Sequence, residues 1–147
     1  MTADSRVDAL QTALAAEHAA VWVYAALAGQ ADPVTDPRLR TDLTAAYAVH
    51  RGRRDALARA VVDAGATPVA AEPAYELPSH LGTATALTRA ALHLERATAE
   101  TYAWVVARTT GPDRRRAVEA VNDAAVRELV FRGTPEMLPG ANEYADR

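Results

Sequence analysis

The sequence predicts an all-α protein built as one four-helix bundle. Ala accounts for 36 of the 147 residues and only 5% of the residues are aromatic. This composition suits helices, because Ala has the highest helix propensity while β-sheets favour branched and aromatic side chains. Pro and Gly are gathered in short stretches that leave four long segments between them. The length is that of one domain, so we expect a single helical domain over residues 1–147.

The first two helices are predicted over residues 5–29 and 37–64. Ser5 can cap the first helix, because a hydroxyl at the N-cap accepts a hydrogen bond from the first turn. Asp36 suits the N-cap of the second helix, and Pro37 suits its first position, where no backbone N–H is needed. Only a short turn separates the two segments.

The last two helices are predicted over residues 79–109 and 113–132. Ser79 can cap the third helix. The sequence Gly111-Pro112-Asp113 forms a tight connection to the fourth helix, because Gly and Pro both interrupt a helix.

The two central helices are joined by residues 66–78, which hold three prolines and form the one long irregular stretch. Thirteen extended residues reach about 43 Å at about 3.3 Å each. A helix of about 29 residues is about 44 Å long. The connection can therefore run back along the whole bundle, and a long central crossover between short outer turns is typical of the ferritin-like arrangement.

Composition and charge exclude several classes of function. The 16 basic residues are all Arg and face 19 acidic residues, giving a net charge of −3, so we expect no nucleic-acid partner. The absence of Cys excludes disulfides, thiolate zinc sites and iron–sulfur clusters. No apolar leader and no apolar run of about 18 residues is present, so we expect a cytoplasmic protein without a membrane partner.

Charged side chains interrupt the apolar stripe predicted for each helix. Glu17 lies within the stripe of the first helix, His50 within that of the second, Glu95 within that of the third and Glu128 within that of the fourth. Counted from the helix ends, these four residues fall at about the same depth. They predict a buried polar layer across the bundle. Its expected members are Glu17, Tyr24, Tyr47, His50, Arg53, Arg54, Glu95 and Tyr102.

Two interpretations of this layer remain open, since buried carboxylates must be paired or bind a metal ion. In the first, Arg53 or Arg54 bridges Glu17 and Glu95, His50 donates to a carboxylate, and the tyrosines supply hydroxyl groups. In the second, iron or manganese binds to the carboxylate and imidazole groups that project inward from facing helices. The metal ligands would then be Glu17, His50, Glu95 and Glu128. We expect the polar network and no cofactor, because two guanidinium groups would cancel the field that a cation needs.

Four segments of the chain stand out together: Ala16–Tyr24, His50–Leu57, Gly65–Pro68 and Leu138–Gly140. They resemble a bacterial family of small ferritin-like proteins known only as a domain of unknown function. The likeness covers essentially the whole chain, including the acid at Glu95 and the crossover around Tyr75.

The resemblance implies a ferritin-like fold but an incomplete di-iron site. Ferritin-like di-iron proteins carry a Glu on each of two helices and a Glu-x-x-His motif on each of the other two. Glu17, Glu95 and His50 match this pattern. Tyr47 stands where the acid of the second-helix motif is expected, and the fourth helix has no His. Only three of the six usual ligands therefore carry over.

Two functions from different classes follow. The chain is expected to be a non-catalytic scaffold that binds a small molecule or a protein partner, because acids needed for di-iron chemistry are missing. The alternative is a mononuclear metal protein or oxidase that uses Glu17, His50 and Glu95. Trp22 and Trp104 fall outside the predicted buried stripes, which indicates a helical homodimer face.

Overall fold

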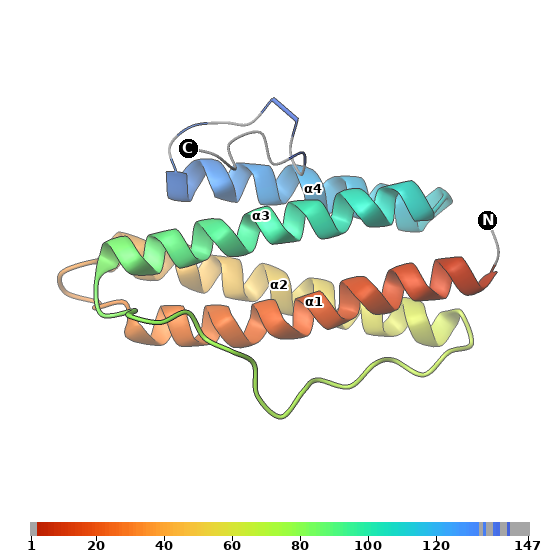
Figure 1. The fold of residues 1–147 in the computed structure, drawn as a ribbon, viewed down its shortest axis with the longest axis horizontal. Helices are drawn as coiled ribbons and strands as arrows, with labels where there is room; N and C mark the ends of the chain where they lie inside the picture. Colours follow the sequence, from red (N-terminus) through yellow and green to blue (C-terminus); the bar gives the residue numbers. More distant parts are fainter. Residues whose placement is uncertain (1–2, 133, 135–136, 139–140, 142–147) are drawn as a thin grey trace.

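The computed structural model describes residues 3–132 together with residues 134, 137–138 and 141. Pro139 and Gly140, which belong to one of the segments of the family resemblance, lie outside the described residues. All the regular elements in the described part are helices, and they pack as a four-helix bundle (Figure 1). The predicted all-α fold class is therefore confirmed. The helices are α1 (Ala3–Gln30), α2 (Pro37–Asp63), α3 (Ala84–Arg108) and α4 (Gly111–Arg132).

The order of the helices matches the predicted crossover topology. A short turn makes α1 and α2 antiparallel, and another makes α3 and α4 antiparallel (Figure 1). Residues 64–83 run back along the length of the bundle, so that α2 and α3 point in the same direction. The bundle therefore consists of two helical hairpins joined by a long crossover.

The crossover is held against α1 by side chains of that helix. The Gln11 amide donates to the Thr67 carbonyl at 2.7 Å and accepts from the Val69 backbone N–H at 2.8 Å. His18 Nε2 lies 3.1 Å from the Val69 carbonyl oxygen. These polar contacts fix the path of the crossover without burying its backbone in the core.

The predicted helix boundaries agree with the structure to within two residues, except at the start of α3. That helix was expected to begin at Ser79, but it begins at Ala84. His80 has a φ of 59°, in the left-handed region that a right-handed helix cannot include. The helix can start only beyond it, and the Thr83 hydroxyl caps it by accepting from the Ala86 N–H at 3.2 Å.

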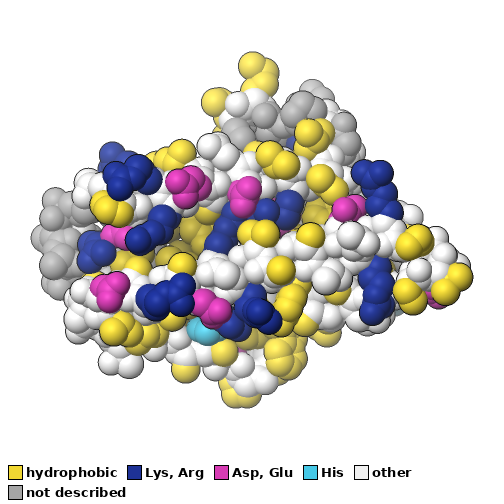
Figure 2. All heavy atoms as spheres, turned by 180° about the vertical axis from the view of Figure 1, so that it is seen from behind, with side chains coloured by type: hydrophobic (Ala, Val, Ile, Leu, Met, Phe, Trp, Pro, Cys, Tyr) yellow, Lys and Arg dark blue, Asp and Glu magenta, His cyan; other side chains and the backbone are white. Residues whose placement is uncertain are grey.

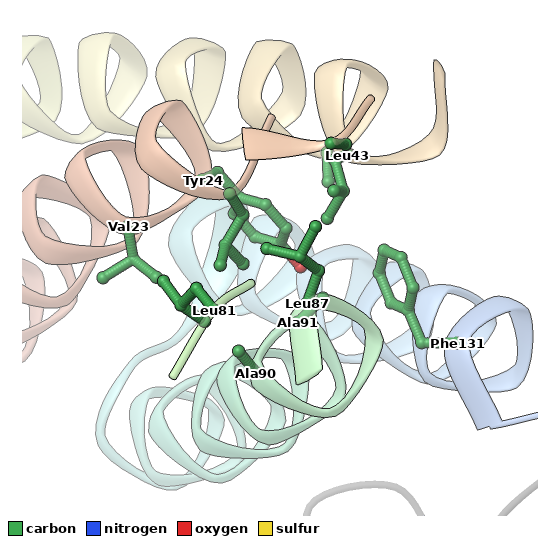
Figure 3. Close-up of a cluster of buried hydrophobic side chains, with 11 residues drawn as sticks. Val23, Tyr24, Leu43, Leu81, Leu87, Ala90, Ala91 and Phe131 are labelled. Atoms are coloured by element: carbon green, nitrogen blue, oxygen red, sulfur yellow. The ribbon is translucent and has the colours of Figure 1, made fainter. Parts of the chain in front are cut away.

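The principal apolar cluster lies toward the end of the bundle that holds the α1–α2 turn. Figure 3 shows its side chains converging from all four helices, with Leu81 of the crossover added. Alanines such as Ala46 and Ala91 are fully buried in it, so the helices pack through small side chains as the composition predicts. The labelled members are Val23, Tyr24, Leu43, Leu81, Leu87, Ala90, Ala91 and Phe131.

The two tryptophans both have neighbours within the chain. Trp22 is 41% exposed, and its ring lies 6.2 Å from that of Tyr75 in the crossover. The Trp104 ring is covered by the guanidinium of Arg108 at 4.0 Å. These contacts shield part of each indole, so they weaken the reason for expecting a homodimer, which stays a prediction.

None of the helices in the described part of the chain combines the length and apolar character needed to cross a membrane.

Candidate functional site

Three of the predicted layer residues meet at the centre of the bundle. His50 Nδ1 lies 2.6 Å from Glu17 Oε2, and His50 Nε2 lies 3.1 Å from Glu95 Oε1. All three side chains are buried from solvent. The imidazole of α2 thus bridges a carboxylate of α1 and a carboxylate of α3. We call Glu17, His50, Glu95 and the groups bonded to them the ionic layer.

Two tyrosines donate to the same carboxylates. Tyr102 on α3 donates to Glu17 Oε1, and Tyr24 on α1 donates to Glu95 Oε1, each at 2.6 Å. The Tyr24 ring also stacks on the His50 imidazole, with ring centroids 5.1 Å apart. Burial, followed by the charge of the neighbouring glutamate, raises the pKa of each phenol well above its usual value. Both hydroxyl groups therefore remain protonated donors.

The residues of the ionic layer occupy corresponding positions in the two hairpins. Glu17 and Tyr24 stand seven residues apart on α1, and Glu95 and Tyr102 stand seven residues apart on α3. The interval from Glu17 to Glu95 equals the interval from His50 to Glu128. Each tyrosine bonds to the glutamate of the opposite helix, so the two hairpins contribute corresponding residues.

The cation beside Glu95 is Arg127 of α4, which corrects the prediction for Arg53 and Arg54. Arg127 Nε donates to Glu95 Oε1 at 2.8 Å. Arg54 instead pairs with its neighbour Asp55 at 2.7 Å, and Arg53 turns toward α4. Helix α4 packs directly on α3, so a side chain at the edge of its buried face reaches Glu95. Arg53 and Arg54 of α2 instead pair with Asp123 and Asp55.

Arg53 bridges α2 and α4 on the other side of the layer. Its Nη2 donates to Asp123 Oδ2 at 2.9 Å and to the Ala120 carbonyl at 3.3 Å. Its guanidinium lies 5.4 Å from the centre of the Tyr102 ring, within the range of a cation–π contact. Arg53 therefore touches a residue of the ionic layer but is held mainly by α4.

The pKa values of His50 and Glu95 shift in opposite directions because each group stabilises the charged form of the other. Burial alone lowers the pKa of His50, but the hydrogen bonds and charges of Glu17 and Glu95 outweigh burial and raise this pKa above its usual value. Burial alone raises the pKa of Glu95, but His50, Arg127 and Tyr24 outweigh it and lower this pKa. The carboxylates thus favour the charged form of His50, and His50, Arg127 and Tyr24 favour the charged form of Glu95.

Tyr47 and Glu128 lie outside this group of contacts. Within the described residues, Tyr47 packs beside the principal apolar cluster and makes no hydrogen bond to the layer. Glu128 is buried, and its Oε2 lies 3.7 Å from Arg96 and 3.4 Å from Arg132. Glu128, the fourth metal ligand of the second interpretation, thus lies beside two arginines.

The donor set does not fit a metal centre as it is arranged. A histidine that binds a metal must turn one ring nitrogen toward it, yet both nitrogens of His50 face carboxylates. Arg127 already supplies a cation to Glu95. Among the described residues, no group of three or more His, Asp or Glu side chains is placed so that it could hold a metal ion.

A cavity that the sequence does not reveal opens between α2 and α4, next to the ionic layer. Its volume is about 330 Å³. Leu10 of α1 and Tyr102 and Val105 of α3 form its floor, while α2 and α4 form its walls. Figure 2 shows this face of the molecule, where apolar side chains lie in a hollow between charged ones. We call this space the α2–α4 cavity.

Three acidic residues line the α2–α4 cavity, Asp113, Glu119 and Asp123, and two of them are paired with arginines. Asp113 Oδ2 lies 2.6 Å from Arg6, and Asp113 Oδ1 lies 3.1 Å from Arg116. Asp123 Oδ2 lies between Arg53 at 2.9 Å and Arg127 at 3.4 Å. The latter contact joins the rim of the cavity to the ionic layer.

Fold and site together define a four-helix bundle with a long crossover and a buried ionic layer. The chain belongs to the family described as Domain of unknown function (DUF4439), whose family model matches residues 9–143. It is similar to a conserved hypothetical protein, rv2844, from Mycobacterium tuberculosis, known from a crystal structure. The two chains are 28% identical, with a TM-score of 0.79 over 88% of this chain and 90% of that chain. None of the curated proteins matches the sequence.

Proposed function

We propose that this protein is a non-catalytic, ferritin-like scaffold that binds a small molecule in the α2–α4 cavity. In this proposal the ionic layer holds the bundle together and takes no part in chemistry. The observation that carries the proposal is the cavity itself, whose volume of about 330 Å³ falls within the range of small-molecule sites, about 300–1,000 Å³.

The lining of the cavity supports a ligand with an apolar body. Leu57 and Ala60 of α2 and Ala117 of α4 lie opposite Val105 on its floor. Small-molecule sites combine such apolar walls with a few placed polar groups, and Arg53 and Asp123 provide these at the rim. A cavity between helices of a bundle is also a frequent place for a ligand.

The pairing within the ionic layer supports its structural role. A general base or a metal ligand needs a lone pair that is free to act, whereas His50 is held between two carboxylates. Tyr24 and Tyr102 direct their hydroxyl groups to the same carboxylates. The imidazole and the two hydroxyl groups are thus engaged in holding neighbouring helices together.

A neutral fluorescent probe, N-phenyl-1-naphthylamine, tests binding in the cavity. Gly52 lines the cavity, and an added Cβ at this position would meet no atom within 4 Å. A Gly52→Trp substitution should therefore obstruct the cavity without disturbing the core, while Gly52→Ala serves as the matched control. We expect saturable fluorescence enhancement with the wild type and Gly52→Ala, and at least a tenfold weaker response with Gly52→Trp. Equal responses from all three proteins would overturn the proposal.

A further inference from the structure

Charged side chains at the α2–α4 cavity stand in pairs of opposite sign. Arg53 lies 2.9 Å from Asp123, and Arg116 lies 3.1 Å from Asp113. All four residues line the cavity. A ligand ion near either pair would meet a charge of its own sign next to the opposite one, so that attraction and repulsion largely cancel. The pairs therefore select neither an anion nor a cation.

The fifth charged residue of the described lining, Glu119, is exposed to solvent. A contact between an exposed carboxylate and a ligand cation is screened by water and contributes little free energy. A cation that left water to enter the cavity would lose more through desolvation than this contact returns. Glu119 therefore does not turn the cavity into a cation site.

The described lining of the cavity has no free side-chain hydroxyl, amide or imidazole. None of these lining residues is Ser, Thr, Asn, Gln or His, and the Tyr102 hydroxyl donates to Glu17 at 2.6 Å. A polar ligand atom buried there would lose its water without gaining a partner, which is costly. The interior thus favours the carbon atoms of a ligand over its polar atoms.

The apolar walls and floor leave room for a body of limited size. Gly52, Ala56 and Ala60 follow one another at four-residue intervals on α2 and share one face of that helix, while Leu10 and Val105 form part of the floor. A water molecule in the liquid occupies about 30 Å³, so a cavity of about 330 Å³ holds on the order of ten non-hydrogen atoms. A single ring with a short aliphatic chain has this size.

We infer that the α2–α4 cavity binds an uncharged, mainly hydrocarbon molecule of this size, packed on Leu10, Leu57 and Val105, with at most one polar group at the rim. A hydroxyl group at the rim stays in reach of water and of Asp123, whose side chain is 56% exposed. This inference rests on the proposed function and deepens it, because it names the ligand as neutral.

Calorimetric titration of the full chain with matched probes tests the inference. 3-Phenyl-1-propanol, 3-phenylpropanoate and 3-phenylpropylamine share one ring and differ at neutral pH in the charge of the head group. We expect the alcohol to bind about tenfold more tightly than either ion, or more, because an ion loses hydration without finding an unpaired buried partner in the cavity.

Variants locate the binding and test the role of Glu119. Gly52→Trp should abolish binding of the alcohol and Gly52→Ala should retain it, because only the larger side chain fills the cavity. Glu119→Gln should leave the affinities for the alcohol and for the amine unchanged. Circular dichroism and melting temperature verify that each variant is folded.

The outcomes distinguish two kinds of failure. If either ion binds as tightly as the alcohol, or if Glu119→Gln abolishes binding of the amine, the inferred ligand class is wrong while the cavity remains a binding site. The same conclusion follows if the alcohol does not bind but the naphthylamine probe responds to Gly52→Trp. If the alcohol does not bind and the naphthylamine probe ignores Gly52→Trp, the proposed function fails together with the inference.

Discussion

His50 Nδ1 lies 2.6 Å from Glu17 Oε2, and neither side chain reaches solvent. This pair connects α1 to α2 at the middle of the bundle. Because a buried charge without its partner is strongly destabilising, the contact makes Glu17 and His50 interdependent. Substitution of either residue leaves the other charge without its closest counterion.

Substitution of Glu17 by Gln should therefore destabilise the fold. We expect a loss of about 3–5 kcal/mol in the free energy of unfolding, as for other broken buried ion pairs. Urea unfolding followed by circular dichroism measures this loss. Glu100→Gln on the exposed face of α3 is the control and should change stability by less than about 0.5 kcal/mol. Equal effects from the two variants would show that the pair is not required.

The pH dependence of stability should reveal the charged imidazole. The pKa of His50 is raised above its usual value of 6.5, so its contribution is complete below that pH and is lost as the pH rises through the raised pKa. Between those two pKa values, the wild type should lose about 1.4 kcal/mol per pH unit relative to His50→Gln. Unfolding measured from pH 5.5 to 9 compares the two proteins, and parallel curves would contradict a charged His50.

Glu95 should act at the acidic end of the range. Its pKa is lowered from its usual value of 4.5, so its contribution is complete above that pH and is lost as the pH falls through the lowered pKa. The ionic layer should consequently stabilise the fold most between about pH 4.5 and 6.5. Acid titration of Glu95→Gln should show a smaller loss of stability below pH 4.5 than the wild type shows.

The crossed tyrosines should each contribute through a hydroxyl group. Tyr24→Phe and Tyr102→Phe should each lower the free energy of unfolding by about 1.5–3 kcal/mol, the contribution of a hydrogen bond to a charged group. Tyr47→Phe is the matched control, because Tyr47 makes no hydrogen bond to the layer within the described residues. Thermal and chemical unfolding of the three variants give the comparison, and a Tyr47 effect as large as the others would refute it.

Metal ions should not stabilise the protein. With His50 held at both nitrogens and Arg127 beside Glu95, we expect less than one metal ion per chain after purification without chelator. EDTA should leave the melting temperature unchanged, since a ligand stabilises only the state that binds it. Elemental analysis and a melting curve test this together. Stoichiometric metal that is lost in Glu17→Gln would instead favour the mononuclear metal protein.

Much of the site could be predicted because helix periodicity gives the face on which a side chain lies, and helix length gives its depth along the bundle. Glu17, His50 and Glu95 interrupt apolar stripes at equal depth, and the structure brings them into contact. The arginine could not be chosen in the same way. Arg127 reaches Glu95 because α4 packs directly on α3, and the periodicity of a single helix does not reveal which helix it packs on.

No feature of the sequence indicated the α2–α4 cavity. Its residues follow the same apolar pattern as a closed interface, and the space between α2 and α4 depends on how two hairpins dock. The correspondence of Glu17 with Glu95 and of His50 with Glu128 is likewise recognisable only when the helices are in position, because few of the intervening residues are alike.

The two hairpins have a further consequence for how the chain holds together. Glu17 and His50 form an ion pair within the first hairpin, and Glu95 and Arg127 form one within the second. Each half thus contains one of these pairs, while the Arg6–Asp113 and Arg53–Asp123 pairs join the two halves. The crossed tyrosine bonds are directional and select one alignment of the two halves. The fold resembles a complex of two different hairpins, α1–α2 and α3–α4, that are joined in one chain. The crossover acts as the linker that keeps the two hairpins at high local concentration.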